Sequence, residues 1–116
     1  YEAMLHLIPK RPEAVFAASD TMALGAMRAL REAGLRVPDD IALAGFDGSA
    51  AAETTNPPLT TVVQDVHETG RRAVAALNDL ITDPDRNPIV DVLPVQLLER
   101  ASSGGERAGA HAGSPS

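Results

Sequence analysis

The first half of the chain alternates apolar runs with helix caps and helix breakers, and this order restricts it to a strand–helix–strand unit. Residues 14–18 form a short apolar run that is typical of a buried strand. Ser19 is a cap-type residue, and apolar residues then recur at helical spacing through 22–33 until Gly34. A second apolar run, 41–46, follows. Two strands joined through a helix in one sheet are parallel, so we expect a right-handed βαβ unit.

The same alternation continues in the second half. Residues 60–64 favour a third strand, and Asp65 with Glu68 three residues later fits a capping pattern at a helix start. The helix is predicted to turn one apolar face inward, formed by Gly70, Ala73, Val74, Leu77, Leu80 and Ile81. Residues 89–99 again favour β structure, where Pro94 indicates an edge strand or a crossing segment. The order of elements therefore predicts an α/β fold.

The two ends of the sequence set the predicted domain limits. Tyr1, Met4 and Ile8 fall at helical spacing, as in a helix already under way, so we expect a fragment whose domain is incomplete at its amino end. At 116 residues the chain has room for one core. Residues 101–116 are small, polar and glycine-rich, which predicts a disordered tail after a folded domain over residues 1–100.

Charge and composition exclude several classes of site. The formal net charge is -6, the pI is about 4.9 and Lys10 is the only lysine, so no basic surface for nucleic acid is expected. A chain without cysteine forms neither disulfides nor thiolate metal sites. The Asp and Glu spacings fit no metal-binding loop and no Ser-His-Asp set is in place, so we expect no metal, no cofactor and no enzyme. No signal peptide or membrane span is predicted, which is compatible with a cytoplasmic protein.

Polar residues follow three of the predicted strands at the point where each strand ends. Ser19 and Asp20 follow the first strand, Asp47 follows the second and Gln64 follows the third. In open parallel sheets ligands bind beyond the carboxyl ends of the strands, so one crevice could collect these side chains. Each position also has a purely structural interpretation, as a helix cap, a turn or the start of a loop.

Four motifs occur in a fixed order: residues 12–27 (PEAVFAASDTMALGAM), 34–47 (GLRVPDDIALAGFD), 58–62 (PLTTV) and 93–100 (LPVQLLER). Together they resemble the LacI/GalR family of bacterial transcription regulators, specifically the carboxyl-terminal part of its effector-binding region. The resemblance implies a periplasmic-binding-protein-like fold of type I, in which a parallel, Rossmann-like sheet lies in a three-layer α/β/α arrangement. One of the two subdomains of that fold would be present here.

The resemblance also implies an effector site in the cleft between the two subdomains. The residues that line the cleft in family members match Ser19, Asp47 and Gln64, and we include their motif neighbours Asp20 and Phe46 as expected ligand-binding residues. A carboxylate at position 47 would accept hydrogen bonds from sugar hydroxyls or ring N–H groups. Ser19 stands where many sugar-responsive members have Asn, which removes a carboxamide with two donors and leaves the identity of the effector open.

A subunit contact is implied as well, on the helix of residues 22–30 and on the segment 49–57. The candidate contact residues are Leu24, Met27, Ala50, Ala51 and Ala52. For Leu24 and Met27 the alternative is packing in the core. A homodimer matters because a two-fold protein fits a two-fold operator. Operator DNA would be bound by an amino-terminal helix-turn-helix domain that this sequence does not contain.

The resemblance thus implies the effector-sensing and dimerisation part of a cytoplasmic DNA-binding regulator, a repressor that responds to a sugar or similar metabolite. The alternative is a fragment of a periplasmic or extracellular sugar-binding protein for transport, which shares the fold but needs export. A signal sequence upstream would favour transport. A phosphoacceptor domain is a third interpretation because Asp20 and Asp47 both end strands, but Lys10 precedes the first strand instead of ending one.

Overall fold

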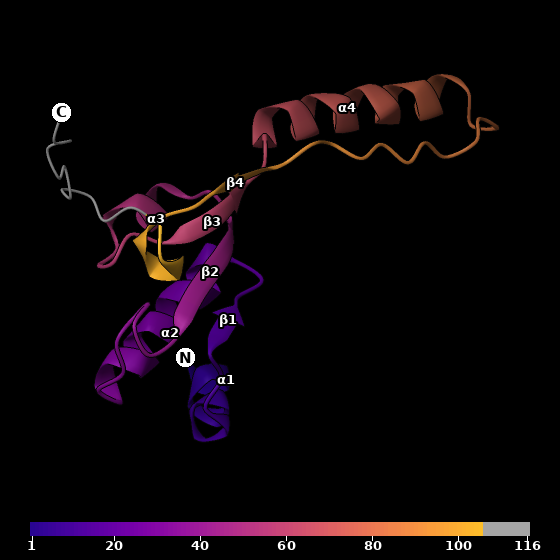
Figure 1. Ribbon diagram of the computed structural model, residues 1–116. Helices are drawn as coiled ribbons and strands as arrows, with labels where there is room; N and C mark the ends of the chain where they lie inside the picture. Colours follow the sequence, from indigo (N-terminus) through magenta and orange to yellow (C-terminus); the bar gives the residue numbers. More distant parts are fainter. Residues whose placement is uncertain (106–116) are drawn as a thin grey trace, which may run out of the picture. The chain divides into compact units, whose positions relative to one another are not determined.

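The computed structural model describes residues 1–105 of the chain (Figure 1). These residues divide into two compact units, which are described separately below. Unit 1 contains residues 1–63 together with the carboxyl-terminal segment from Leu97, and unit 2 is Gln64–Gln96. The chain therefore leaves unit 1 after its third strand and returns to it near its end.

Unit 1 is built on parallel strands, as the sequence predicts. Its elements in chain order are α1 (Glu2–Leu7), the 3₁₀ helix η1 (Ile8–Lys10), β1 (Ala14–Phe16), α2 (Asp20–Glu32), β2 (Ala42–Asp47), α3 (Ala50–Thr54), β3 (Thr60–Val63), β4 (Gln96–Leu98), whose first residue belongs to unit 2, and the 3₁₀ helix η2 (Ala101–Ser103). The sheet order is β1-β2-β3-β4, and β2 pairs in parallel with both β1 and β3. The α/β class with a parallel sheet is confirmed.

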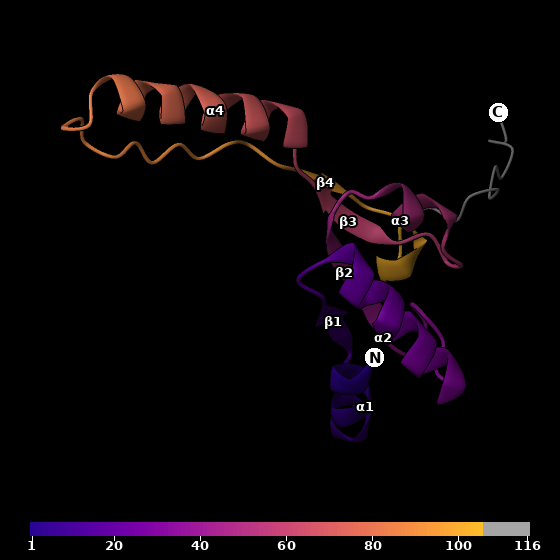
Figure 2. The same ribbon diagram turned by 180° about the vertical axis from the view of Figure 1, so that it is seen from behind.

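Helix α2 begins and ends where the sequence indicates. Ser19 is its N-cap, and its hydroxyl oxygen accepts a hydrogen bond from the Met22 amide at 3.2 Å. At the other end Gly34 has φ +72° and the Leu35 amide donates to the Leu30 carbonyl, a Schellman arrangement that requires the left-handed backbone which glycine supplies. Helix α2 packs against β2 and lies behind that strand in Figure 1 and in front of it in Figure 2.

The core of the described residues lies in unit 1. Leu30 of α2, Leu43 of β2 and Leu59 before β3 are fully buried, and they are joined by Met4 of α1 and by small residues such as Ala23 and Ala29. Small residues at the α2 surface let that helix approach the sheet closely. Each buried leucine contributes about 1.5–3 kcal/mol through removal of apolar surface from water.

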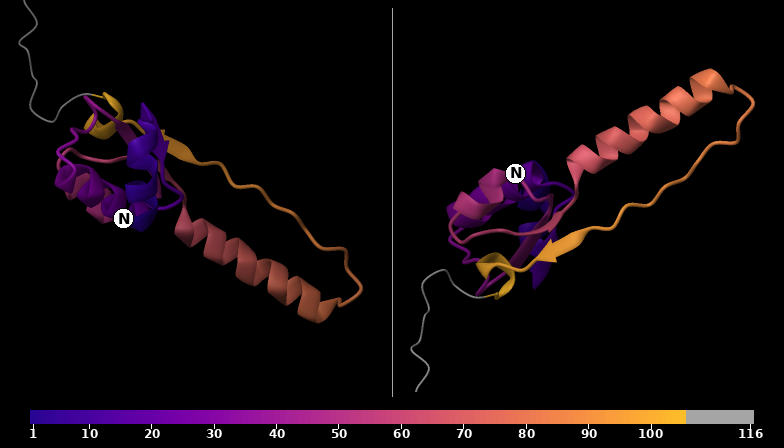
Figure 3. Two further views of the ribbon diagram at one scale, coloured as in Figure 1. Left: turned by 90° about the horizontal axis from the view of Figure 1, so that it is seen from below. Right: turned by 90° about the horizontal axis from the view of Figure 1, so that it is seen from above.

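Unit 2 consists of α4 (Val66–Thr82) and a segment of residues 83–95 that runs back alongside it (Figure 3). The Asp65 carboxylate caps α4 by accepting from the Glu68 amide at 2.9 Å, which confirms the predicted helix start. The predicted inward apolar face is wrong for the described residues, because no residue of α4 is buried and Val74, Leu77 and Ile81 are at least 57% exposed. The helical period was identified correctly, but nothing in unit 2 covers that face.

The carboxyl-terminal boundary is also corrected. The sequence predicts a disordered tail from residue 101, yet Ala101 and Ser102 are buried in η2. The Ser102 hydroxyl donates to the Leu43 carbonyl at 2.6 Å and accepts from the Thr60 amide at 2.8 Å. A segment of small polar residues predicts disorder when only its composition is considered. Here the small size of Ser102 lets it fit between two strands. The remainder of the predicted tail lies outside the described residues.

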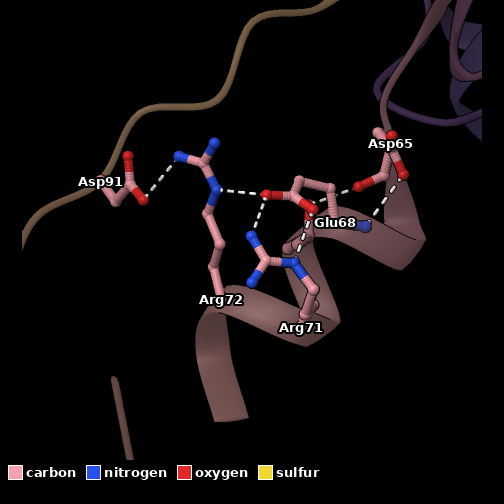
Figure 4. Close-up of polar contacts among 6 residues, drawn as sticks. Asp65, Glu68, Arg71, Arg72 and Asp91 are labelled. Carbon is pink, nitrogen blue, oxygen red and sulfur yellow. Dashed lines mark hydrogen bonds and ion pairs between the residues drawn. The ribbon is translucent and has the colours of Figure 1, made fainter. Parts of the chain in front are cut away.

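A cluster of ion pairs holds the two parts of unit 2 together (Figure 4). Glu68 accepts from Arg71 at 2.6 Å and from Arg72 at 2.7 Å, and Arg72 also donates to Asp91 in the returning segment at 2.9 Å. The guanidinium groups of Arg71 and then Arg72 lower the pKa of Glu68 from 4.5 to about 2. Glu68 therefore stays ionised in the folded unit well below its ordinary range.

This depressed pKa predicts an acid-sensitive unit 2. A carboxyl with a lowered folded pKa contributes stability above its unfolded pKa of 4.5 and loses it as the pH falls towards about 2. We expect the helicity of α4, followed by NMR shifts of its amides, to fall across this window, and the Glu68 side chain to titrate near 2. In Glu68→Gln the helicity of α4 should change less over this pH range. A Glu68 titration midpoint near 4.5 would contradict the ion-pair geometry.

No helix of the described residues is long and apolar enough to span a bilayer. Within residues 1–105, His, Asp and Glu side chains form no group of three or more that could hold a metal ion.

Candidate functional site

The carboxyl ends of β1, β2 and β3 meet at one edge of unit 1. The register pairs Phe16 with Ala44 between β1 and β2, and Asp47 with Val63 between β2 and β3. Ser19 follows β1 after two residues, and Asp47 is the last residue of β2. Two of the predicted strand-end positions therefore lie at the same edge, which is where ligands bind in parallel α/β sheets.

Asp47 has the least favourable backbone conformation in this region. Its φ is +126° and its side chain is exposed. Such a backbone costs a residue other than glycine about 1–3 kcal/mol, and it persists only where the surroundings impose it. The next residue, Gly48, has φ +70°, and a Cβ added there would meet Val63 of β3 at 2.6 Å. The turn after β2 is thus a fixed structure, and it presents the Asp47 carboxylate at the strand-end edge.

Ser19 has both of the interpretations that the sequence left open. It is half-buried at the end of the β1–α2 connection, and its oxygen accepts from the Met22 amide as an N-cap. That bond uses one lone pair of the hydroxyl and leaves its O–H proton as a donor. A cap role and a ligand contact are therefore compatible at this position.

Asp20 is placed differently from the expectation. Its side chain is only 2% exposed, with one carboxylate oxygen accepting from the Thr61 hydroxyl at 2.6 Å and the other from the Ser49 amide at 2.7 Å. Burial alone would raise the pKa of Asp20, but the hydrogen bonds from Thr61 and Ser49, together with the charge of Arg100, outweigh it, and the pKa lies below its ordinary value. The carboxylate is ionised and occupied by internal donors, so the structure does not present Asp20 to a ligand.

The other two predicted ligand residues are Phe46 and Gln64. Phe46 is half-buried in β2, directly before Asp47. Gln64 directly follows β3 in the chain, belongs to unit 2 as its first residue and is half-buried. Unit 1 alone therefore brings Ser19, Phe46 and Asp47 to its edge.

The predicted subunit-contact residues fall into two groups. Ala50 and Ala51 are exposed on α3, and Leu24 is half-buried on α2. Met27 and Ala52 are core residues with 7% and 0% exposure, so for them the proposed contact is corrected to core packing. For Met27 this is the alternative that the sequence offered, packing in the core. Met22, which is 54% exposed on α2, was missed among the residues available for contact.

Thr61 is the functional neighbour that sequence reasoning missed. It is fully buried, donates to Asp20 and accepts from the Gly48 amide at 3.2 Å. In the sequence it is one of two threonines in a β-rich run, and threonine is common in strands for steric reasons alone. The two threonines differ only in the face of β3 that they occupy, since the Thr60 hydroxyl bonds to Arg100 and Ser103 instead. That difference gives no signal of a carboxylate partner.

Known proteins are similar to this chain in sequence and in fold. The sequence profile of periplasmic binding protein-like domains matches residues 1–103. The HTH-type transcriptional regulator CelR of Thermobifida fusca is 44% identical over 102 residues, which cover 86% of this chain and 30% of CelR. A solved CelR–cellobiose complex matches with a TM-score of 0.80 and 43% identity, over 87% of this chain and 32% of that chain. The lac repressor dimer bound to operator and the anti-inducer ONPF matches with a TM-score of 0.78 and 34% identity, over 89% and 32%.

This chain spans about a third of the length of these relatives. Its parallel sheet and its sequence motifs both agree with the matches, and the family profile covers all but two of the described residues. The chain therefore belongs to the family of periplasmic binding protein-like domains, and it corresponds to the carboxyl-terminal part of the effector-binding region of LacI/GalR-type regulators.

Proposed function

We propose that this chain senses a small-molecule effector within a LacI/GalR-type transcription regulator, a repressor that responds to a sugar or similar metabolite. Asp47 carries the proposal, because an exposed carboxylate is held at φ +126° on the edge where three parallel strands end. Strain of this kind clusters at binding and catalytic sites. Cellobiose in the similar CelR complex supports a sugar as the class of effector.

The side chains at this edge suit a polyhydroxylated ligand. The Asp47 carboxylate accepts hydrogen bonds from sugar hydroxyls, and its charge strengthens them. The Ser19 O–H donates to a ligand oxygen while its own oxygen stays bonded to the Met22 amide. Phe46 offers a partly exposed ring to an apolar sugar face. Gln64 is proposed as a further contact on the resemblance alone.

Ligand binding acts by shifting an equilibrium between two arrangements of the regulator. A ligand shifts that equilibrium only by its difference in affinity for the two arrangements. Coupling between sites in allosteric proteins is typically about 1–3 kcal/mol, or roughly 5- to 150-fold in affinity. We propose that the effector changes operator affinity by a factor in this range.

We propose a homodimer that uses the exposed Ala50 and Ala51 of α3 with Leu24 of α2. The lac repressor in the similar structure is a dimer on its operator, which supports this assembly. A two-fold protein meets a two-fold operator with matching half-sites. DNA contact is assigned to residues outside this chain, since its net charge of -6 opposes phosphate binding.

Regulation is favoured over transport and over enzymatic activity. CelR and the lac repressor, to which this chain is similar, are transcription regulators, which supports this choice. We propose a cytoplasmic protein, because a transcription regulator acts on DNA there, whereas a solute-binding protein acts after export.

The test uses the complete protein that carries this sequence. Calorimetric titration with cellobiose and a panel of other mono- and disaccharides should identify a binding sugar. The same sugar should change the affinity for operator DNA, selected from genomic fragments, by roughly 5- to 150-fold. A protein that binds sugar but no DNA would support transport. A protein that binds DNA with no response to any small metabolite would remove the sensing role.

A further inference from the structure

We propose that Asp20 and Thr61 are positioning residues, which hold the turn after β2 so that Asp47 keeps the backbone conformation presenting its carboxylate. The inference deepens the proposed function and rests on it only for the identity of Asp47 as a ligand residue. Neither Asp20 nor Thr61 contacts the effector in this proposal, because both are buried, with 2% and 0% exposure.

The pair binds the two residues that directly follow Asp47. The Gly48 amide donates to the Thr61 hydroxyl at 3.2 Å, and the Ser49 amide donates to an Asp20 carboxylate oxygen at 2.7 Å. Two successive backbone amides are therefore directed into the interior of unit 1. A chain whose next two amides are fixed has little freedom left at Asp47, and this fixes the orientation of the peptide that follows it.

The hydroxyl of Thr61 links the two anchors. It donates its single proton to the second Asp20 oxygen at 2.6 Å, so only its lone pairs remain to accept from Gly48. The direction of each bond is thus determined, and the chain of bonds ends on a carboxylate, where charge-assisted bonds are strongest. Helix α2, the turn after β2 and strand β3 meet at these two side chains.

The backbone packs closely against the Asp20 side chain and around the turn after β2. A Cβ added at Gly45 of β2 would lie 2.5 Å from the bonded Asp20 oxygen. A Cβ added at Gly48 would lie 2.6 Å from the Val63 side chain. Glycine is required at both places, so the backbone approaches the carboxylate on one side and β3 on the other. The strained φ of Asp47 is therefore imposed by contacts on the same three elements.

The neighbouring threonine provides a matched control. Thr60 is buried too, but its hydroxyl bonds to Arg100 and Ser103 near the carboxyl end of the described chain and makes no contact with the turn. Thr61→Val and Thr60→Val are the same chemical change on adjacent residues of one strand. Both should destabilise unit 1, and only Thr61→Val should release Asp47.

The experiment is NMR on the 116-residue chain without any ligand. In Thr61→Val, amide hydrogen exchange at Gly48 should rise at least about tenfold more than in Thr60→Val, because the hydroxyl that accepts from this amide is lost. In Asp20→Asn the side-chain nitrogen cannot accept, so the bond from Thr61 or the bond from Ser49 is lost, and exchange at Gly48 and Ser49 should rise by a similar factor. The three-bond coupling between the Asp47 amide and Hα should move to the large value of an extended strand. Thr61→Ser keeps the hydroxyl and should retain the original exchange rates and coupling.

If both variants leave Gly48, Ser49 and the Asp47 coupling as they are in Thr60→Val, the positioning role is overturned. Should Asp20→Asn fail to fold, the Thr61→Val and Thr61→Ser pair still decides the question. In the complete protein, titration with cellobiose should show about 10- to 100-fold weaker binding for Thr61→Val than for Thr60→Val at similar thermal stability. If the unsubstituted protein does not bind cellobiose, the proposed effector is wrong. The NMR result still decides whether Asp20 and Thr61 hold the turn.

Discussion

In the complete regulator, Asp47→Ala is expected to weaken sugar binding about 100-fold and to remove the effect of sugar on operator affinity. Hydrogen bonds to a charged group contribute about 1.5–3 kcal/mol each, so loss of two such bonds accounts for at least this factor. Asp47→Asn keeps the shape of the side chain without its charge. Its affinity for sugar should lie between those of Asp47→Ala and the unsubstituted protein. Calorimetric titration with the sugar identified for the unsubstituted protein measures the change.

The strained backbone of Asp47 allows a second comparison, between the glycine and the alanine variant. Asp47→Gly also removes the carboxylate, but glycine adopts φ +126° without the steric cost that alanine bears. Both variants should lose effector binding equally. In chemical denaturation Asp47→Gly should be more stable than Asp47→Ala by about 1–3 kcal/mol. Equal stability of the two would mean that the turn is not strained, and retained effector binding in either would remove Asp47 from the site.

Ser102→Ala is expected to cost about 2–4 kcal/mol of the free energy of unfolding. The buried hydroxyl donates to the Leu43 carbonyl and accepts from the Thr60 amide, and a buried group left without its partner costs about 1–3 kcal/mol. Domains of this size have only about 5–15 kcal/mol of stability, so the loss is a large fraction. Urea denaturation of the 116-residue chain measures it as a lower midpoint at constant slope.

Thr54→Ala is the control for this experiment. Its hydroxyl also donates to a carbonyl, that of Ala51, but it is exposed, so water replaces the bond. The unfolding free energy should change by no more than about 0.5 kcal/mol. A Ser102→Ala effect as small as that of Thr54→Ala would show that the two hydrogen bonds of the Ser102 hydroxyl do not contribute to the stability of unit 1.

Local chemistry is sufficient to predict the helix ends in both units. The caps at Ser19 and Asp65 and the glycine at position 34 act within a few residues, so their signal is contained in the sequence around them. The position of Asp47 at the end of β2 followed from the same reasoning, because a carboxylate and a glycine interrupt an apolar run. Its strained φ did not follow, since it depends on contacts with α2 and β3.

Features that depend on distant partners were misjudged. Asp20 lies beside Ser19 in sequence, but its carboxylate is directed to Thr61, which is 41 residues away. The composition after residue 100 predicted disorder, because no local pattern shows that Ser102 bonds with β2 and β3. The face of α4 had the correct period but no covering layer within the described residues. In each case the missing information is the identity of the facing residue, which periodicity does not contain.

The bond between Thr60 and Ser102 also has a consequence for synthesis of the chain. Its two residues are 42 positions apart, so β3 is synthesised before its last partner. At about 5–20 residues per second, translation of the intervening segment takes a few seconds. During that interval the Thr60 amide and the Leu43 carbonyl lack the Ser102 hydroxyl to which both bond in the folded unit. Unit 1 therefore completes its sheet only after translation has passed Ser102, and a chain truncated within unit 2 would lack the hydroxyl that joins β2 to β3.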